Sequence, residues 1–217
     1  MMDAEEIRRM QDERTAAWHG DFRDPSLTGL MDITVQQHRA NFDLWHQEDE
    51  ARDPFTSDAK LAQIKRAIDG LNQRRNDLVE RIDTLLVAEA GVMRADAPLH
   101  SETPGMMIDR LSILSLKCYH MTEEFKRETA SEALRVRNGR RLEVLQEQHA
   151  DLVECLKLLW NEIQRGSRRF KLYRQMKMYN DPELNPALYR NARVGRGEEV
   201  DLEARSAYKT DTSKNSD

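Results

Sequence analysis

The stretch LWHQEDEARDP at residues 44–54 combines a tryptophan, a histidine, four carboxylates and an arginine, which are side chains of acid–base and anion-binding sites. Carboxylates and imidazoles transfer protons, and a guanidinium binds phosphate or carboxylate groups. On a helix, Trp45, Asp49 and Arg52 fall on one face at steps of four and three, and Glu48 lies one position aside. Because tryptophan seldom faces water alone, we expect this segment to add an Asp–Arg pair and a glutamate to an interior polar site.

A second polar row follows residues 65–83 at helical steps: Lys65, Asp69, Asn72, Asn76, Glu80 and Asp83. It can be a solvated helix face held by pairs such as Lys65–Asp69. Two features favour an inward row instead. Amides are poor helix formers on a free surface, and Arg75 occupies an apolar position where it would need a buried partner.

A third row lies between residues 109 and 124. Asp109, Ser112, His120 and Glu123 share one helix face, with Arg110 and Lys117 in a neighbouring row. His120 can be a hydrogen-bonded core residue, but polar rows on two helices also suggest that the rows face each other. We expect a buried network of Asp69, Asn72, Arg75, Asp109, Arg110 and His120.

Two functions fit these rows. The first is a binding or accessory protein in which the network fixes the helix register and shapes a pocket or partner surface. The alternative is an enzyme acting on a phosphorylated or nucleotide-linked small molecule. There Arg52, Arg110 and Lys117 would bind the anion, and Asp49, Glu102 or His120 would transfer protons. No glycine-rich phosphate loop, GxSxG or HExxH motif is present, which favours the binding role.

A metal site is not expected from these patterns. Di-metal bundles use Glu-x-x-His motifs, whereas this chain has His46-x-x-Asp49 and His120-x-x-Glu123, in the reverse order. The many arginines and lysines can neutralise the carboxylates as salt bridges. We therefore predict no metal ligand, and the sequence names no cofactor.

The elements that must position these side chains are long helices. Heptad spacing of apolar residues runs through Leu61, Ile64, Ile68, Leu71, Leu78, Ile82 and Leu85. Capping residues and glycines predict helices at 3–18, from Ser26 to Asp53, after Ser57, from Thr103, and from Gly139 to Gly166, with a short turn at Ser131. The predicted fold is all-α, an antiparallel bundle of four to five helices. We expect an N-terminal helix and linker at 1–25, the bundle at 26–189 and a disordered polar tail at 190–217.

A last helix is expected at 165–178, where six basic residues and no acidic ones alternate with aromatics. It can dock its apolar side on the bundle or bind phosphate, RNA or an anionic membrane.

Composition narrows the setting. The net charge of −5 argues against general nucleic-acid binding. The start lacks the pattern of a secretory signal, and no segment has the apolar length of a membrane span. Cys118 and Cys155 fall in apolar helical patterns, as reduced thiols do. We expect a cytoplasmic protein that binds an anionic small molecule or a protein partner, and the long seam can also pair two chains into a homodimer.

Four blocks carry a resemblance to a known family: NFDLWHQEDEARDP, KRAIDGLNQRRNDLVERID, SETPGMMIDRLSILSLKCYHMTEE and YRQMKMYNDPELNP. Over roughly residues 30–189 the chain resembles the bacterial family named domain of unknown function 4254. The resemblance implies a mainly helical cytosolic protein and no established reaction. It also suggests an association with sugar-transferring enzymes of the cell envelope. The family pattern maps onto the candidate binding residues Trp45, Glu48, Arg52, Asp69, Asn72, Arg74, Asp109, Arg110 and Lys117. Gly105 departs from a bulkier residue in some relatives, a change expected to affect only a helix start.

Overall fold

The computed structural model describes residues 2–22, 24–174 and 183–186. Within them lie five helices: α1 (Ala4–Trp18), α2 (Gly29–Ala51), α3 (Asp58–Ala90), α4 (Pro104–Lys126) and α5 (Glu132–Gln164). All five belong to one compact unit, residues 1–174, and in the second unit only 183–186, which include a turn, are described. The all-α class with antiparallel helices is confirmed, and the predicted tail at 190–217 lies outside the described residues. The three-part division of the chain stays a prediction.

Local capping chemistry sets most of the helix starts. The side chain of Asp3 accepts hydrogen bonds at the start of α1, as do those of Ser57, Thr103 and Ser131 at the starts of α3, α4 and α5. The predicted cap at Ser26 is wrong. The helix α2 begins at Gly29, whose φ of +67° is a left-handed conformation that favours glycine, so the chain turns into the helix there.

Two further expectations about helix ends are wrong. Gly139 does not interrupt α5, which runs unbroken from Ser131. The glycine instead packs closely against α4, since a Cβ there would lie 3.1 Å from the ring of Phe125. The predicted basic helix is not helical over the described residues 165–174. His100 donates a backbone hydrogen bond to Arg169 in that segment, so the chain returns extended along residues 98–100. Residues 175–178 lie outside the described part.

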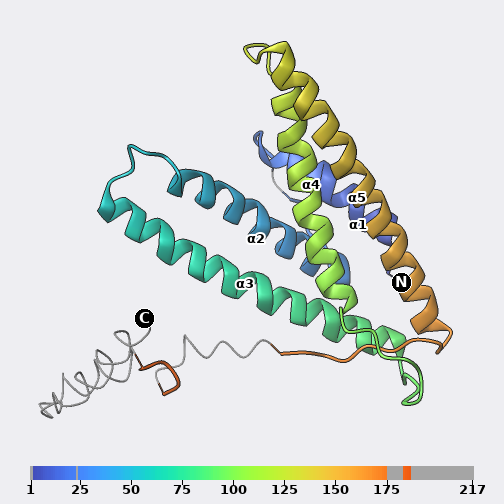
Figure 1. Ribbon diagram of the computed structural model, residues 1–217. Helices are drawn as coiled ribbons and strands as arrows, with labels where there is room; N and C mark the ends of the chain where they lie inside the picture. The colour runs from blue at the N-terminus through green and yellow to red at the C-terminus, as the bar shows by residue number, and fades with distance from the viewer. Residues whose placement is uncertain (1, 23, 175–182, 187–217) are drawn as a thin grey trace, which may run out of the picture. The chain divides into compact units, whose positions relative to one another are not determined.

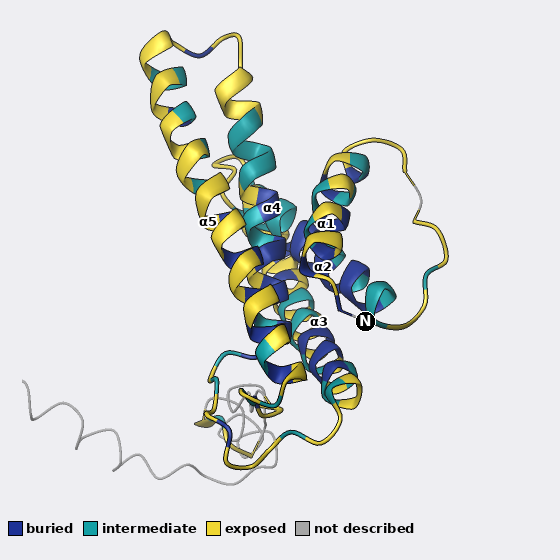
Figure 2. Ribbon diagram, turned by 90° about the vertical axis from the view of Figure 1, so that its right-hand side faces the viewer, coloured by how far each residue is buried: buried dark blue, intermediate teal, exposed yellow. Residues whose placement is uncertain are grey.

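The helices form two antiparallel hairpins, α2 with α3 and α4 with α5, and α1 crosses α4 (Figure 1). The predicted seam on α3 faces inward, with Ile64 and Ile68 packed against Leu44 of α2. Further along, Leu78 and Ile82 join the main core, which α1, α4 and α5 also enter. Leu61 is exposed, so the seam begins one turn later than predicted. The turn end of the α4–α5 hairpin extends beyond the other helices and is largely exposed (Figure 2).

A buried carboxylate joins α3 to the start of α4. Asp83 accepts hydrogen bonds from the hydroxyl of Thr103 and from the backbone N–H of Gly105, the latter at 2.7 Å. Burial raises the pKa of Asp83 to about 6, while these two hydrogen bonds act in the opposite direction. A Cβ on Gly105 would lie 2.6 Å from Asp83 Oδ1 and 2.9 Å from the carbonyl oxygen of Val79. Gly105 is therefore required by the packing of two helices, not only by the helix start.

We predict that Gly105→Ala lowers the free energy of unfolding by about 1–3 kcal/mol, because the added methyl group forces α3 and α4 apart. Urea denaturation followed by circular dichroism measures the change. Gly70→Ala is the matched control: Gly70 is inside α3, and nothing lies within 4 Å of its Cβ position. Better helix propensity should raise the stability of this control by up to about 1 kcal/mol. Equal effects of the two substitutions would contradict the packing argument.

Candidate metal centre

A chain of buried hydrogen bonds links α1, α2 and α4. Thr15 Oγ1 lies 3.0 Å from His38 Nε2, and His38 Nδ1 lies 2.7 Å from Ser112 Oγ. Asn41 Nδ2 lies 2.9 Å from Ser112 Oγ and 2.9 Å from Asp109 Oδ1. All five residues are buried, so none of these groups can rely on bulk water as a partner.

The direction of each hydrogen bond in this chain can be assigned. Thr15 donates its hydroxyl proton to the carbonyl of Gln11 at 2.9 Å, so it must accept from His38 Nε2. Burial lowers the pKa of His38 to about 3, which keeps the ring neutral. Nδ1 of a neutral ring with a proton on Nε2 is an acceptor, and Ser112 therefore donates to it. Asn41 then donates to both Ser112 and Asp109.

Asp109 is the acceptor at the end of the chain. Besides Asn41, the side chain of Gln37 donates to its Oδ1 at 2.5 Å, and Arg75 Nε lies 3.4 Å from the same oxygen. Burial raises the pKa of Asp109, whereas the charge of Arg75 and the two amide donors lower it. The expected ion pair between the seam arginine and the α4 aspartate is present, with Asp109 buried and Arg75 half-buried.

The other predicted network members lie elsewhere. Asp69 is exposed and pairs with Lys65, and Arg110 is exposed and pairs with Glu102 at 2.8 Å. Arg74 and Lys117 are exposed, and Asn72 is half-buried outside the network. Arg52 does not form the predicted inner pair with Asp49, although both residues line one hollow with Trp45. It pairs with Glu48 at 3.1 Å on the surface, and Asp49 is exposed, because the last turn of α2 extends past the helices that would cover it.

The residues of the predicted enzyme site do not share one cavity. Asp49 and Arg52 line a hollow of about 400 Å³ with Trp45, Glu48 and Arg75. Glu102 and Arg110 line another, of about 720 Å³. His120 lines a third, of about 910 Å³. The residues proposed for the enzyme alternative are thus divided among three hollows, each lined by residues of both kinds: Asp49 with Arg52, Glu102 with Arg110, and His120 with Lys117.

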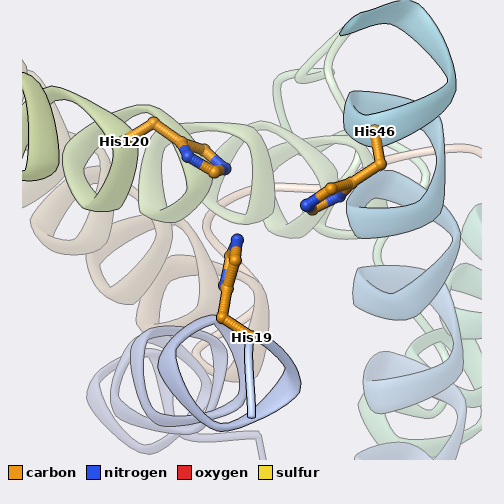
Figure 3. Close-up of side chains that lie close together, drawn as sticks. All are labelled: His19, His46 and His120. Carbon is orange, nitrogen blue, oxygen red and sulfur yellow. The ribbon is translucent and has the colours of Figure 1, made fainter. Parts of the chain in front are cut away.

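The structure instead brings together three histidines from three elements. His19 follows the last turn of α1, His46 lies near the end of α2, and His120 lies on α4. One ring nitrogen of each lies within 4.8 Å of the others, and the rings point toward one another (Figure 3). Aromatic stacking supports two of the rings. Trp45 stacks on His120 at 4.8 Å, and Tyr119 stacks on His19 at 4.4 Å between ring centroids.

Hydrogen bonds fix the tautomer of each imidazole. His19 Nδ1 lies 2.7 Å from the carbonyl oxygen of Thr15, and His46 Nδ1 lies 2.8 Å from that of Phe42. A carbonyl can only accept, so both Nδ1 atoms carry the proton. His120 Nδ1 lies 2.9 Å from Glu123 Oε2, a carboxylate partner of the kind that orients metal-binding histidines. In the neutral rings, each Nε2 therefore presents a lone pair.

His120 is the most constrained of the three. Its Nε2 is buried and has no hydrogen-bond partner within the described residues. Burial lowers the pKa of His120, Glu123 raises it, and the neighbouring His19 and His46 lower it further. Burial and the two neighbouring histidines thus favour the neutral ring, whose buried Nε2 lies beside two other imidazoles. Such an unsatisfied acceptor costs free energy unless a ligand occupies the site.

The sequence analysis noted His46 with Asp49 and His120 with Glu123 and predicted no metal site. The pair of His120 with Glu123 is present, but the cluster joins His46 and His120 to His19, which the sequence analysis did not consider. His19 occupies the C-cap of α1 and reaches the site because α1 crosses α4. No spacing rule within one helix could show that, since the cluster exists only after three elements pack.

The profile of a family described as "Protein of unknown function (DUF4254)" matches residues 31–172, more than half of the chain. The chain belongs to the DUF4254 family. No curated protein and no solved structure matches it. The DUF4254 match includes His46, His120 and Asp109, whereas Thr15 and His19 precede it. The third imidazole therefore comes from a helix outside the matched region. Among the described residues, no helix is both long and apolar enough to cross a membrane.

Substitutions at two adjacent positions on α4 should distinguish the contribution of the buried network to stability from that of a surface ion pair. We predict that Asp109→Ala lowers the free energy of unfolding by about 2–4 kcal/mol, because it leaves two buried amides and the Arg75 charge without their acceptor. Arg110→Ala, which removes only an exposed ion pair, should change it by less than about 0.5 kcal/mol. Chemical denaturation measures both. Similar losses of stability in the two variants would contradict the distinction between the buried acceptor Asp109 and the exposed ion pair of Arg110.

The neutral His38 should make stability fall in acid. Its native pKa of about 3 lies below the unfolded value of about 6.5, so the unfolded chain binds one more proton between these pH values. Stability from this residue is complete above pH 6.5 and decreases as the pH falls. When the pH is lowered from 7 to 5, the free energy of unfolding of the wild type should decrease by about 2 kcal/mol more than that of His38→Gln. Urea midpoints at several pH values measure this, and parallel curves for the two proteins would refute it.

Proposed function

We propose that this DUF4254 protein binds one divalent transition metal ion, Zn²⁺ foremost, through the Nε2 atoms of His19, His46 and His120. A single observation carries the proposal: three imidazoles have ring nitrogens within 4.8 Å of one another, and their Nδ1 atoms are engaged by separate acceptors, which leaves the Nε2 atoms for an ion. Neutral imidazole nitrogens are ligands that Zn²⁺ prefers.

The distances between the three ring nitrogens fit a site whose histidines move closer together when a metal ion binds. Tetrahedral Zn²⁺ with bonds of 2.0–2.1 Å places its nitrogen ligands about 3.3 Å apart. The ring nitrogens lie within 4.8 Å of one another, so the rings need to approach by up to about 1.5 Å. His19 can supply much of this movement, because it is exposed at the end of α1, while the ring of His120 is held between Trp45 and Glu123.

Three neutral ligands imply a particular kind of centre. The ion would keep most of its double positive charge, offset only by Glu123 behind His120. Structural zinc sites use four protein ligands, whereas sites with three keep a position for water or another ligand. Among the described residues, no fourth histidine, cysteine or carboxylate joins the cluster. The site would therefore bind an exchangeable ligand, preferably an anion.

This proposal is a specific form of the binding or accessory role expected from the sequence. The buried network would serve it by holding α1, α2 and α4 in the register that brings the histidines together. A connection with cell-envelope glycan synthesis, a cytoplasmic location and a homodimer through α3 all stay predictions. In the enzyme alternative the proposed residues are divided among three hollows instead of gathered in one cavity.

The test is the metal content of protein purified without a histidine tag. We predict about one Zn²⁺ per chain by elemental analysis and native mass spectrometry. His19→Ala, His46→Ala and His120→Ala should each weaken binding at least about 100-fold in a chelator competition. Glu123→Gln should weaken it about 10- to 100-fold, since it loses the carboxylate behind His120.

Co²⁺ loading gives a second measurement, because tetrahedral Co²⁺ with nitrogen ligands absorbs visible light in a pattern that reports the coordination. His100→Ala serves as the matched control: His100 also donates its Nδ1 hydrogen bond to a backbone carbonyl, that of Glu102, but lies outside the cluster. His100→Ala should bind metal as tightly as the wild type. The proposal is refuted if the wild-type protein binds no metal, or if the three histidine variants of the cluster keep wild-type affinity.

A further inference from the structure

A groove with unusual charge runs between α4 and α5. Figures 1 and 2 show that this hairpin extends beyond the other helices near its turn. The groove lies in this part of the hairpin, and Trp45 and His120 also line it. Its volume is about 910 Å³. Apart from those two residues, it is lined by Lys117, Met121 and Glu124 of α4 and by eight residues of α5 between positions 133 and 148.

The floor of the groove is apolar and open to solvent. Val136 and Val144 of α5 are each about half exposed, at 50% and 51%, and Leu145 and Met121 lie between the two helices. Leu145 lies seven residues before Leu152 and so is in line with the stripe that packs against the core further along α5, whereas Val136 and Val144 lie to one side of that stripe. Large aliphatic side chains gathered in this way on a surface are typical of binding sites.

The rim of the groove is basic. Lys117, Arg137, Arg140 and Arg141 carry four positive charges, against one negative charge on Glu124. Within the described part of the chain, none of these four side chains forms an ion pair or a hydrogen bond. On the rest of the surface, many arginines pair with a carboxylate, as Arg8, Arg39 and Arg127 do. Four unpaired cations around one apolar groove, in a protein of net charge −5, select an acidic occupant.

The shape of the groove matches a helix. The lining residues of α5 span positions 133–148, a length of about 22 Å along the helix axis, or four helical turns. Two helices form its walls, and an amphipathic helix places apolar side chains in such a groove at steps of three, four and seven. We propose that this groove binds an acidic amphipathic helix of a protein partner. The partner's apolar face would cover Val136 and Val144, and its flanking carboxylates would pair with the arginines.

Charge and polarity disfavour the other occupants. A second copy of this hairpin would bring the two basic rims together, which like charges oppose. A nucleic-acid backbone would satisfy the arginines but would leave the apolar floor wet. A lipid surface is flat, whereas the cations here surround a groove between two helices. The groove shares His120 with the proposed metal site, whereas His19 and His46 do not line the groove.

The direct test uses a designed probe on the full-length protein. The probe is a labelled peptide of about 18 residues with leucines at helical three- and four-residue steps and glutamates elsewhere. We expect saturable binding by fluorescence anisotropy that weakens as salt is raised. A scrambled peptide of the same composition and a peptide with lysines in place of glutamates should each bind at least about tenfold more weakly.

Two substitutions assign the binding to the groove. Arg140→Glu together with Arg141→Glu, and separately Val144→Asp, should each weaken peptide binding at least about tenfold. All three side chains are exposed, so circular dichroism and thermal melting should match the wild type. Arg66→Glu on α3 is the control: it reverses one exposed arginine outside the groove and should leave affinity unchanged within about twofold. His19→Ala should also bind the peptide normally, which separates this proposal from the metal site.

A photo-crosslinking residue in place of Val144 can identify what binds the groove in cells. A crosslinked partner segment that is acidic and amphipathic supports the proposal. It is overturned if the crosslink joins two copies of this chain, if the chain alone dimerises through the groove, or if anionic vesicles or RNA bind there in place of the peptide. Equal binding of the scrambled peptide, or absence of saturation up to about 0.5 mM probe, overturns it as well.

Discussion

The arrangement of α1, α2 and α4 depends on a neutral histidine buried among hydroxyl and amide groups. His38 has one donor and one acceptor nitrogen, and each meets one partner, Thr15 on α1 and Ser112 on α4. A shift of either helix by one residue would leave a buried nitrogen without its partner, at a cost of about 1–3 kcal/mol. Apolar packing alone tolerates small sliding, whereas this hydrogen-bond chain permits one register.

That register also determines the histidine cluster. Thr15 acts twice: its hydroxyl accepts from His38, and its backbone carbonyl accepts from His19. On α2, His46 is held by the carbonyl of Phe42, the residue after the network amide Asn41. The groups that orient two of the three imidazoles are therefore part of, or adjacent to, the buried network. Rigid second partners of this kind are what keep metal-binding rings in position.

The sequence predicted features that depend on one helix at a time. Caps such as Ser57 and Thr103 act within a few residues, and the α3 seam reflects burial along a single face. Arg75 could be assigned a buried partner because it interrupts that seam. The same logic failed for Asp49 and Arg52, since a helix face continues in sequence beyond the point where another helix covers it. The cluster of His19 with two distant residues could not be predicted, because it requires the crossing of α1 over α4.

The α4–α5 hairpin shows why local charge matters more for binding than total charge. Its inner half packs in the core, where α4 also carries Asp109 and Ser112, and its outer half leaves that core with Val136 and Val144 of α5 uncovered. A protein that is acidic overall repels acidic partners at long range, but screening confines this repulsion to about 10 Å at 0.1 M salt. Beyond that distance from the acidic surface, the unpaired arginines of the groove determine what can approach. The fixed inner half gives the outer half a defined shape, so a partner would meet a rigid groove and would lose little affinity to ordering it.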